Sequence, residues 1–196
     1  MLLFLDMNKE LQDLLSHNCV IAAKELIGWQ FFVREANGTL TGGTIVETEA
    51  YSQDDKASHS YNGKTKRNEV MFGPAGRLYV YFTYGMHWCA NIVTGPSGHG
   101  EAVLLRSILP EENIELMRKR RNHRPDNELV NGPAKLCQAL AITGDDNKAT
   151  LNEGRFILQK PKNKPSIAIT ATTRIGIRND TGKLWRFVED SYILLP

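Results

Sequence analysis

The sequence has few cysteines and no long apolar run. Its three cysteines, Cys19, Cys89 and Cys137, are widely spaced and form no C-x-x-C pair. This pattern excludes a disulfide scaffold, a zinc ribbon and a thioredoxin-type site, and it favours buried free thiols in a reducing compartment. No apolar stretch approaches the roughly 18 residues that a membrane span requires. The apolar residues 1–5 lack a basic leader and stop at Asp6, so we expect neither secretion nor residence in a membrane.

The sequence also lacks the spacings that hold metals or phosphates. Its five histidines show no metal-ligand spacing, and its glycines form no phosphate-binding loop. Residues 95–98 (GPSG) lie between two predicted strands, whereas a nucleophile elbow connects a strand to a helix. We therefore expect no metal and no cofactor. A lone histidine in a polar loop, such as His59, is by itself more typical of a surface residue.

The charges are nearly balanced, with 24 basic against 22 acidic side chains, so the net charge does not indicate a nucleic-acid-binding protein. The distribution of the charges is more informative. Residues 64–67 (KTKR) form a basic run in a predicted loop, which fits contacts to a phosphate backbone. Residues 118–121 (RKRR) form a second run at the end of a predicted helix, where cations complement the helix dipole.

The length of 196 residues predicts one domain, and a hydrophobic content of 41% is enough for a sizeable core. Apolar periodicity and turn residues predict the elements. The predicted helices are residues 8–17, 19–27, 110–121 and 134–142, and the predicted strands are residues 29–34, 39–51, 77–83, 87–93, 102–108, 155–159, 167–172 and 184–189. Because strands and helices come in blocks, we predict an α+β fold for residues 1–196. We expect a single compact domain with a curved, mostly antiparallel, open-barrel-like sheet, flanked by helices and carrying a protruding hairpin.

The predicted strand of residues 39–51 carries two acids and a tyrosine on one face. Strand alternation places Glu47, Glu49 and Tyr51 on the same side. Two neighbouring carboxylates push one pKa upward, which suits a general base. The alternative is a solvated polar face with two exposed glutamates, the usual environment of this residue type.

Residues 84–86 (YGM) connect two predicted strands into a hairpin with an unusual tip. Turns normally carry Asn, Asp, Gly or Ser, whereas here a tyrosine and a methionine flank a single glycine. An apolar tip that protrudes into solvent needs a partner, and a base stack opened from the minor groove is one such partner. The alternative is a neighbouring loop that buries the tip.

Lys135 lies in the first turn of the predicted helix that Gly132 and Pro133 open. A cation at that position opposes the helix dipole, at a cost of roughly 0.3–1 kcal/mol. A helix N-terminus together with a lysine is, however, a suitable seat for a phosphate. Lys135 is therefore a candidate phosphate contact.

Several short sequence motifs and single residues occur in a consistent order along most of the chain. They are ETEAY (residues 47–51), His59, GKTKRN (63–68), MF (71–72), LYVYFTYGM (78–86), Asn91, VLLR (103–106) and GPAKLCQAL (132–140). Together they resemble the alkyladenine (3-methyladenine) DNA glycosylase family of the mammalian type. The resemblance runs from about residue 22 to the C-terminus, so residues 1–21, with the first predicted helix, are expected to be specific to this protein.

The resemblance implies a role for each matching residue. Glu49 corresponds to the general base that deprotonates the attacking water, and Arg106 and the carbonyl of Ile175 correspond to groups that hold this water. Tyr51, His59 and Tyr81 correspond to the walls of a pocket for a flipped base, and Asn91 to a residue that disfavours a purine 2-amino group. The implied DNA contacts are Tyr84 and the neighbouring Met86 as a wedge, with Thr65, Met71 and Lys135 on the backbone.

The resemblance thus implies a monofunctional DNA glycosylase of base-excision repair. Such an enzyme flips an alkylated or deaminated purine, of the 3-methyladenine, hypoxanthine or ethenoadenine class, out of duplex DNA and hydrolyses its N-glycosidic bond. Two alternatives remain, a catalytically silent nucleic-acid-binding module and a hydrolase of small nucleosides. The lack of a long leader of the animal type indicates a bacterial enzyme, expected to be a cytoplasmic, nucleoid-associated monomer; a eukaryotic member would be nuclear.

Overall fold

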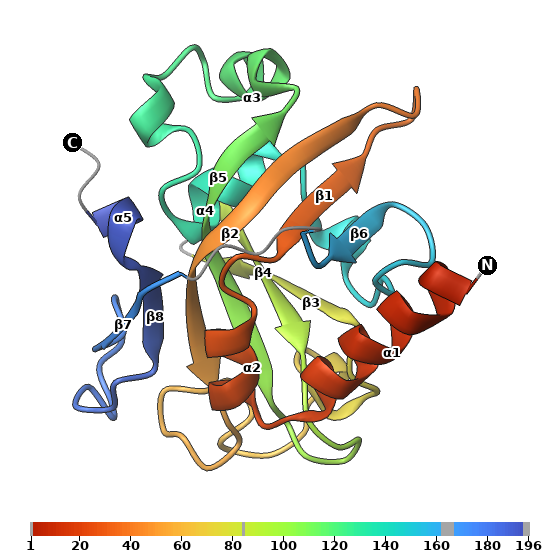
Figure 1. Ribbon diagram of the computed structural model, residues 1–196. Coiled ribbons are helices and arrows are strands. Elements are labelled where there is room, and N and C mark those ends of the chain that lie inside the picture. The colour runs from red at the N-terminus through yellow and green to blue at the C-terminus, as the bar shows by residue number, and fades with distance from the viewer. Residues whose placement is uncertain (1, 84, 162–166, 194–196) are drawn as a thin grey trace.

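A strongly curled antiparallel sheet is the frame of the molecule (Figure 1). The computed structural model describes residues 2–83, 85–161 and 167–193, and within these ranges the side chains of residues 9–192. The strands are β1 (Gln30–Arg34), β2 (Leu40–Tyr51), β3 (Leu78–Thr83), β4 (His87–Val93), β5 (Ala102–Glu112), β6 (Phe156–Gln159), β7 (Ile169–Thr172) and β8 (Arg186–Glu189). Their order is β3-β4-β5-β2-β1-β6, with β8 also paired to β2 and β7 paired to β8.

Strand β2 is shared between two parts of this sheet. One edge of β2 pairs with β5 along almost its whole length. The other edge pairs with β1 through residues 40–44 and with β8 through residues 47–49. Register shifts between Gly42 and Gly43 and between Ile45 and Thr48 interrupt the pairing of β2 with β5, as bulges do in a bent strand. The predicted curvature of the sheet is confirmed, and two of the register shifts adjoin Glu47.

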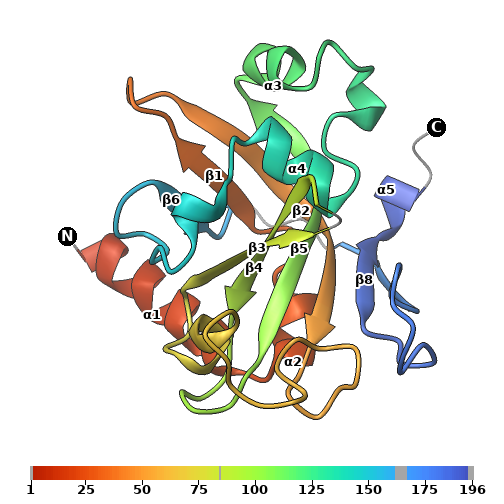
Figure 2. The ribbon, with the colours of Figure 1, turned by 180° about the vertical axis from the view of Figure 1, so that it is seen from behind.

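Helices flank the sheet. They are α1 (Leu2–Ser16), α2 (Cys19–Glu25), α3 (Ile114–Arg120), α4 (Pro133–Ala139) and α5 (Asp190–Ile193), with short 3-10 helices at Glu69–Phe72, Asp126–Glu128 and Gly144–Asp146. α2 lies in front of the sheet in Figure 1, and α4 lies in front of it in the reverse view of Figure 2. The predicted α+β fold is confirmed. No helix within the described ranges is long and apolar enough to cross a lipid bilayer.

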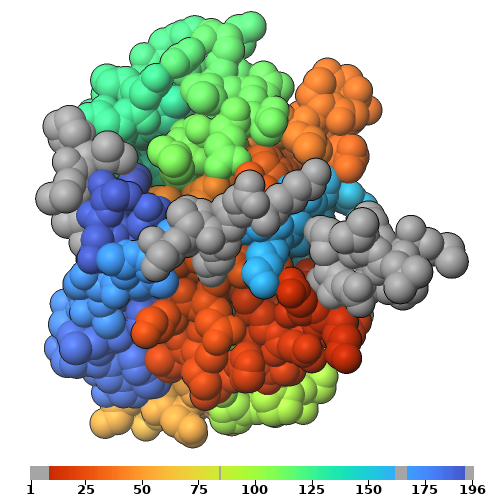
Figure 3. Space-filling view, in the orientation of Figure 1, coloured from red at the N-terminus to blue at the C-terminus, as the bar shows by residue number. Residues whose placement is uncertain are grey.

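The main hydrophobic core joins α1 and α2 to the sheet and to α4. Leu11, Leu14 and Leu15 form the predicted apolar face of α1, and each is at most 7% exposed. Their burial makes α1 part of the common core. The space-filling view shows the N-terminal segment (red) and the β7–β8 segment (blue) side by side on one face of the molecule (Figure 3).

The prediction that a helix begins at Pro110 is wrong. β5 continues to Glu112, with Pro110 paired to Gly43, and α3 begins only at Ile114 after the left-handed Asn113. Pro110 is tolerated in the strand because it lies at the register shift, where the ladder is interrupted. The acids assigned to the helix therefore belong to the strand, where Glu111 accepts hydrogen bonds from side chains of β1 and β2.

The predicted hairpin is formed by β3 and β4. Phe82 pairs with Trp88 and Thr83 with His87, and Gly85 adopts the left-handed conformation (φ 69°). Met86 is 69% exposed, so no neighbouring loop buries this part of the tip. Tyr84, the predicted wedge, lies outside the described residues.

We expect Gly43→Ala to destabilise the fold, because β2 and β5 approach too closely for a side chain. A Cβ at residue 43 would stand 1.9 Å from the carbonyl oxygen of Leu109, which is a backbone atom that cannot rotate away. The free energy of unfolding should fall by about 1–3 kcal/mol or more, measured by urea denaturation. Gly154→Ala, which meets nothing within 4 Å, is the control and should leave stability near that of the parent. Equal stability of both variants would contradict the close approach.

Candidate active site

Both glutamates of the ETEAY motif are buried, so the alternative of a solvated polar face is wrong. Glu47 is 5% exposed and Glu49 is fully buried. They lie on the second half of β2, where β5 covers one edge of the strand and β8 the other. Buried carboxylates need charged or hydrogen-bonding partners. The partners of the two residues differ.

Glu49 accepts two hydrogen bonds and forms an ion pair with a third group. Its Oε1 accepts from the backbone N–H of Ile175 (2.8 Å) and lies 3.2 Å from Nη1 of Arg106. Its Oε2 accepts from the hydroxyl of Tyr51 (2.8 Å). Burial, together with the charge of Glu49, raises the pKa of Tyr51, so the phenol keeps its proton and acts as a donor. The structure thus brings together Glu49, Arg106, Ile175 and Tyr51.

Glu47 is bound to arginines from both neighbouring strands. Its Oε1 accepts from Nε of Arg106 on β5 (2.8 Å) and from Nε of Arg186 on β8 (2.6 Å), and its Oε2 accepts from the hydroxyl of Ser107 (2.9 Å). Burial alone would raise the pKa of Glu47, but the two guanidinium groups bring it below its ordinary value. Glu47 is therefore an ionised anchor for Arg106 rather than a proton acceptor.

A cavity of about 410 Å³ lies beside this cluster. Among the residues that line it are Tyr51, His59, Met71, Tyr79, Tyr81, Cys89, Asn91, Arg106 and Ile175. The lining is predominantly aromatic on one side, where it can accept a planar group. All the predicted wall residues therefore meet at one cavity.

The aromatic wall is ordered by ring contacts and one hydrogen bond. The rings of His59 and Tyr81 meet edge to face at 4.5 Å, and those of Tyr79 and Tyr81 stack at 5.3 Å. Nδ1 of His59 lies 2.9 Å from the Tyr79 hydroxyl. His59 is exposed as a whole residue, but partial desolvation of its ring, aided by the charge of Arg67, lowers its pKa and favours the neutral imidazole.

Asn91 and two residues that the sequence reasoning missed belong to the same wall. Asn91 is 4% exposed and donates from Nδ2 to the carbonyl of Tyr79 (3.1 Å). Tyr79 and Cys89 lie two residues from Tyr81 and Asn91 on their strands, and therefore on the same face. Strand alternation alone would have found both.

The predicted DNA contacts lie in different surroundings. Thr65 is exposed and bonds to Asn68, and Lys135 is partly exposed and donates to Asn131 (2.8 Å). Met71 is only 2% exposed and lines the cavity, so its side chain does not lie on the outer surface. Met86 lies at the exposed hairpin tip and does not line the cavity.

The two basic runs also differ. In the run of residues 118–121, Arg118 pairs with Glu115 and Asp126, and Arg120 pairs with Glu35, so these charges serve the fold around α3. In the run of residues 64–67, every side chain is exposed. Arg67 donates to the carbonyl of Phe82 on β3 (3.3 Å), which places this loop beside the hairpin.

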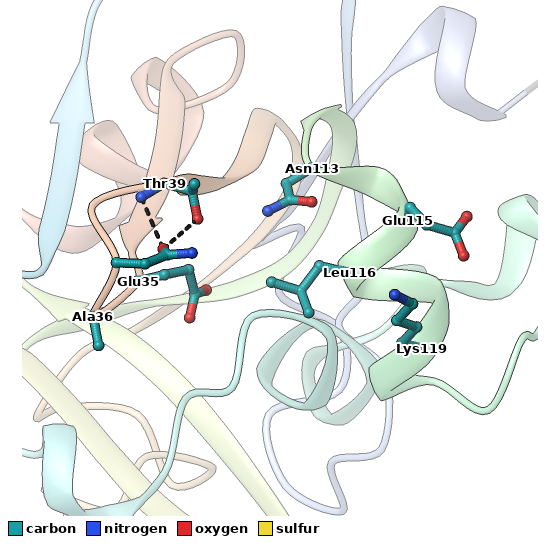
Figure 4. Close-up of a pocket in the computed structure, with 8 residues that line it drawn as sticks. Glu35, Ala36, Thr39, Asn113, Glu115, Leu116 and Lys119 are labelled. Atoms are coloured by element: carbon teal, nitrogen blue, oxygen red, sulfur yellow. Dashed lines mark hydrogen bonds between the residues drawn. The ribbon is translucent and has the colours of Figure 1, made fainter.

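A second cavity, of about 470 Å³, lies at the other end of β2, between the β1–β2 turn and α3 (Figure 4). Its carboxylate Glu35 is engaged by Arg120 and by Thr41. It contains none of the residues predicted for catalysis. Within residues 2–83, 85–161 and 167–193, no group of three or more histidine, cysteine or acidic side chains could hold a metal ion.

Comparisons with known proteins agree with this arrangement. The profile of the family described as "Methylpurine-DNA glycosylase (MPG)" matches residues 13–192. Proteins of Carboxydothermus hydrogenoformans and Agrobacterium fabrum are each 49% identical, over 88% and 90% of this chain and 90% and 86% of their own lengths. A protein of Methanoculleus marisnigri is 48% identical over 81% of this chain and 83% of its own. All three are named "Putative 3-methyladenine DNA glycosylase".

The profile match covers the strands that carry Glu49, Arg106 and the aromatic wall. It begins at residue 13, ahead of residue 22, where the resemblance of the short motifs begins. It also includes the loop that carries Ile175. The predicted family is confirmed. The chain therefore belongs to the methylpurine-DNA glycosylase family, and with it to the hydrolases that cleave the N-glycosidic bond of alkylated bases in DNA.

Proposed function

We propose that the protein is a monofunctional glycosylase that flips a damaged purine into the aromatic cavity and hydrolyses its N-glycosidic bond with water activated by Glu49. The observation that carries this proposal is a fully buried carboxylate whose three partners, Arg106, Tyr51 and Ile175, line an aromatic cavity. The proposed substrates are purines of the 3-methyladenine, hypoxanthine and ethenoadenine class. The names of the relatives support the first of these.

The hydrogen bonds of Glu49 leave room for a further donor. A carboxylate has about four acceptor positions; Ile175 and Tyr51 occupy two of them, and Arg106 faces Oε1 as an ion pair. A water placed at the remaining position gives its proton to Glu49 while its oxygen forms the bond to C1′ of the deoxyribose. Arg106 and the carbonyl of Ile175 are the proposed further contacts of this water.

For a cationic alkylated purine, the leaving group explains why one carboxylate is enough. The electron pair of the breaking N-glycosidic bond moves onto the purine, and a cationic alkylated purine becomes neutral as it leaves. It needs little help from an acid. Because water and not an amine attacks, no covalent enzyme intermediate forms, and we expect an abasic site without strand cleavage.

The cavity walls suit both planar and cationic bases. Tyr51, His59 and Tyr81 offer aromatic surfaces, and a cationic base gains a cation–π contribution from them. The lowered pKa of His59 favours its neutral form, which does not repel a cationic base. Extrusion of the base is required because its C1′ bond cannot be reached within the stack.

The hairpin and the neighbouring loops are the proposed duplex contacts. Tyr84 is the proposed wedge, and the exposed Met86 supports an apolar tip that fills the vacated stack. Thr65 and Lys135 are the proposed phosphate contacts on side chains, whereas the buried Met71 would contribute only its backbone. A monomer is the proposed active form.

A catalytically silent DNA-binding module would use the same hairpin and loops but would not need Glu49. We expect Glu49→Gln to lower the single-turnover rate constant for hypoxanthine excision by about 10²–10⁴-fold, while binding to the lesion duplex is retained. The readout is alkali cleavage of the duplex after incubation with excess protein in EDTA, together with a gel shift. Glu35→Gln is the matched control, since Glu35 is also an arginine-paired carboxylate but lies at the opposite end of β2. Undiminished excision by Glu49→Gln would exclude Glu49 as the base.

The position of Asn91 predicts a change of specificity on substitution. Asn91→Ser should make room for a 2-amino group and raise the ratio of guanine to hypoxanthine excision by about tenfold or more, measured on duplexes that differ only in this base opposite thymine. Asn147→Ser is the control, because Asn147 also bonds to the β3 backbone but does not line the cavity. An unchanged ratio in Asn91→Ser would show that Asn91 does not restrict the pocket.

The lowered pKa of Glu47 predicts a pH-dependent contribution to stability. Because the folded-state value lies below the ordinary 4.5, the unfolded chain binds the proton first as the pH falls. The stability lost in Glu47→Gln should be greatest at neutral pH and should shrink as the pH falls through the folded-state pKa. Urea denaturation of parent and variant across this range measures the difference. A difference that stays constant or grows in acid would contradict the role of Glu47 as an ionised anchor.

A further inference from the structure

Arg174 lies at the centre of a buried group of contacts beside the active-site cluster. It belongs to the loop between β7 and β8, which lies next to the end of β2 (Figure 1). Its guanidinium makes a two-point ion pair with Asp55, and both side chains are fully buried. The same guanidinium donates to the carbonyl of Ala50 on β2 (2.9 Å). One side chain thus ties the β7–β8 loop to β2 and to the loop that follows it.

The guanidinium also contacts aromatic rings, and this arrangement leaves one of its donors unused. Its central carbon lies 4.7 Å from the ring centre of Tyr51 and 5.2 Å from that of Trp185. Nε of Arg174 is buried and has no hydrogen-bond partner among the described residues. A buried donor without a partner is unfavourable. The guanidinium instead packs over the ring of Tyr51, which lines the cavity.

Both hydrogen-bond donors to Glu49 depend on these contacts. The N–H that reaches Oε1 belongs to Ile175, which directly follows Arg174 in the chain. The hydroxyl that reaches Oε2 belongs to Tyr51, whose ring lies under the guanidinium. Ala50, the carbonyl acceptor of Arg174, stands between Glu49 and Tyr51 on β2. The contacts of Arg174 therefore hold both oxygens of the carboxylate indirectly.

We propose that Arg174, paired with Asp55, is a positioning residue for base excision: it holds the Ile175 N–H and the Tyr51 hydroxyl on the two oxygens of Glu49. The inference rests on the proposed role of Glu49 as the base. A guanidinium suits this task because its planar fork binds a carboxylate at two points and stacks on an aromatic face. A lysine offers neither geometry. The pair is thus expected to affect the chemical step more than the binding of DNA.

The test must separate positioning from a general loss of stability. Removing one partner of a buried ion pair leaves an uncompensated charge, so the main variant is the double substitution Arg174→Met with Asp55→Asn. The chain offers a matched control in Arg155, which pairs with Asp146, donates to the carbonyl of Ala141 and lies 5.3 Å from the ring centre of Phe156. The control is Arg155→Met with Asp146→Asn. Arg174→Lys is a third variant, which keeps the charge.

Each variant is compared with the parent by three measurements on folded protein. The first is the single-turnover rate constant for a hypoxanthine duplex, and the second is the affinity for a duplex with a tetrahydrofuran abasic analogue, which places no base in the cavity. The third is the emission of an ethenoadenine duplex on binding, which reports the stacking of the extruded base. Thermal melting checks that each variant is folded at the assay temperature.

We expect the Arg174–Asp55 double variant to lose about 10- to 100-fold in the rate constant and to show altered ethenoadenine emission, with unchanged affinity for the abasic duplex. Arg174→Lys should also be slowed, although less, and the Arg155–Asp146 variant should match the parent. An Arg174–Asp55 variant as fast as the parent would overturn the proposal, as would an equal loss in the control. If the double variant does not fold, a full rate in Arg174→Lys overturns it and a slowed rate at unchanged abasic affinity supports it. A parent without excision, or an active Glu49→Gln variant, would instead refute the proposed function.

Discussion

Two carboxylates buried on one strand require positive charge at the same place, and this requirement organises the second half of β2. Arg106 bridges the two acids, with Nε on Glu47 and Nη1 on Glu49. Arg186 adds a second cation on Glu47. Arg106 comes from β5 and Arg186 from β8, which pair with opposite edges of β2. The pairing of β2 with β5 and β8 thus places both guanidinium groups beside the two glutamates. The strand order that builds the sheet therefore also builds the site.

The two glutamates divide the work because their donors differ. Glu47 receives two guanidinium groups and a hydroxyl, and its lowered pKa keeps it charged. Glu49 receives one guanidinium, a backbone N–H and a phenol that retains its proton. The two cations on Glu47 oppose its protonation. Glu49, whose partners line the cavity, is therefore the better placed of the two for the proposed role of proton acceptor.

Alternation and turn residues are local signals, so the sequence predicted most of the elements and placed Tyr81 and Asn91 on two neighbouring strands that contribute to one cavity. It misplaced Pro110, since the length of β5 is decided by its partner β2 and not by the local appearance of a helix start. It gave Glu47 and Glu49 two readings, because burial depends on β8, which joins the chain much later. It missed the Arg174–Asp55 pair, whose members lie in separate loops, 119 residues apart, without a pattern that marks either. The proposed roles of the site residues come from the family resemblance, and the structure brings Tyr51, Arg106 and Ile175 together around Glu49.

The contact between Ile175 and Glu49 is made by the backbone, while the Ile175 side chain is 52% exposed. An amide donor is the same in nineteen of the twenty amino acids and is missing only in proline. For sequence evolution this means that the hydrogen bond to the carboxylate does not itself restrict the size or polarity of residue 175. Any such restriction comes instead from the cavity, which Ile175 also lines. For this hydrogen bond, only proline at residue 175 is excluded. What must be kept is the backbone conformation that points the N–H at Glu49.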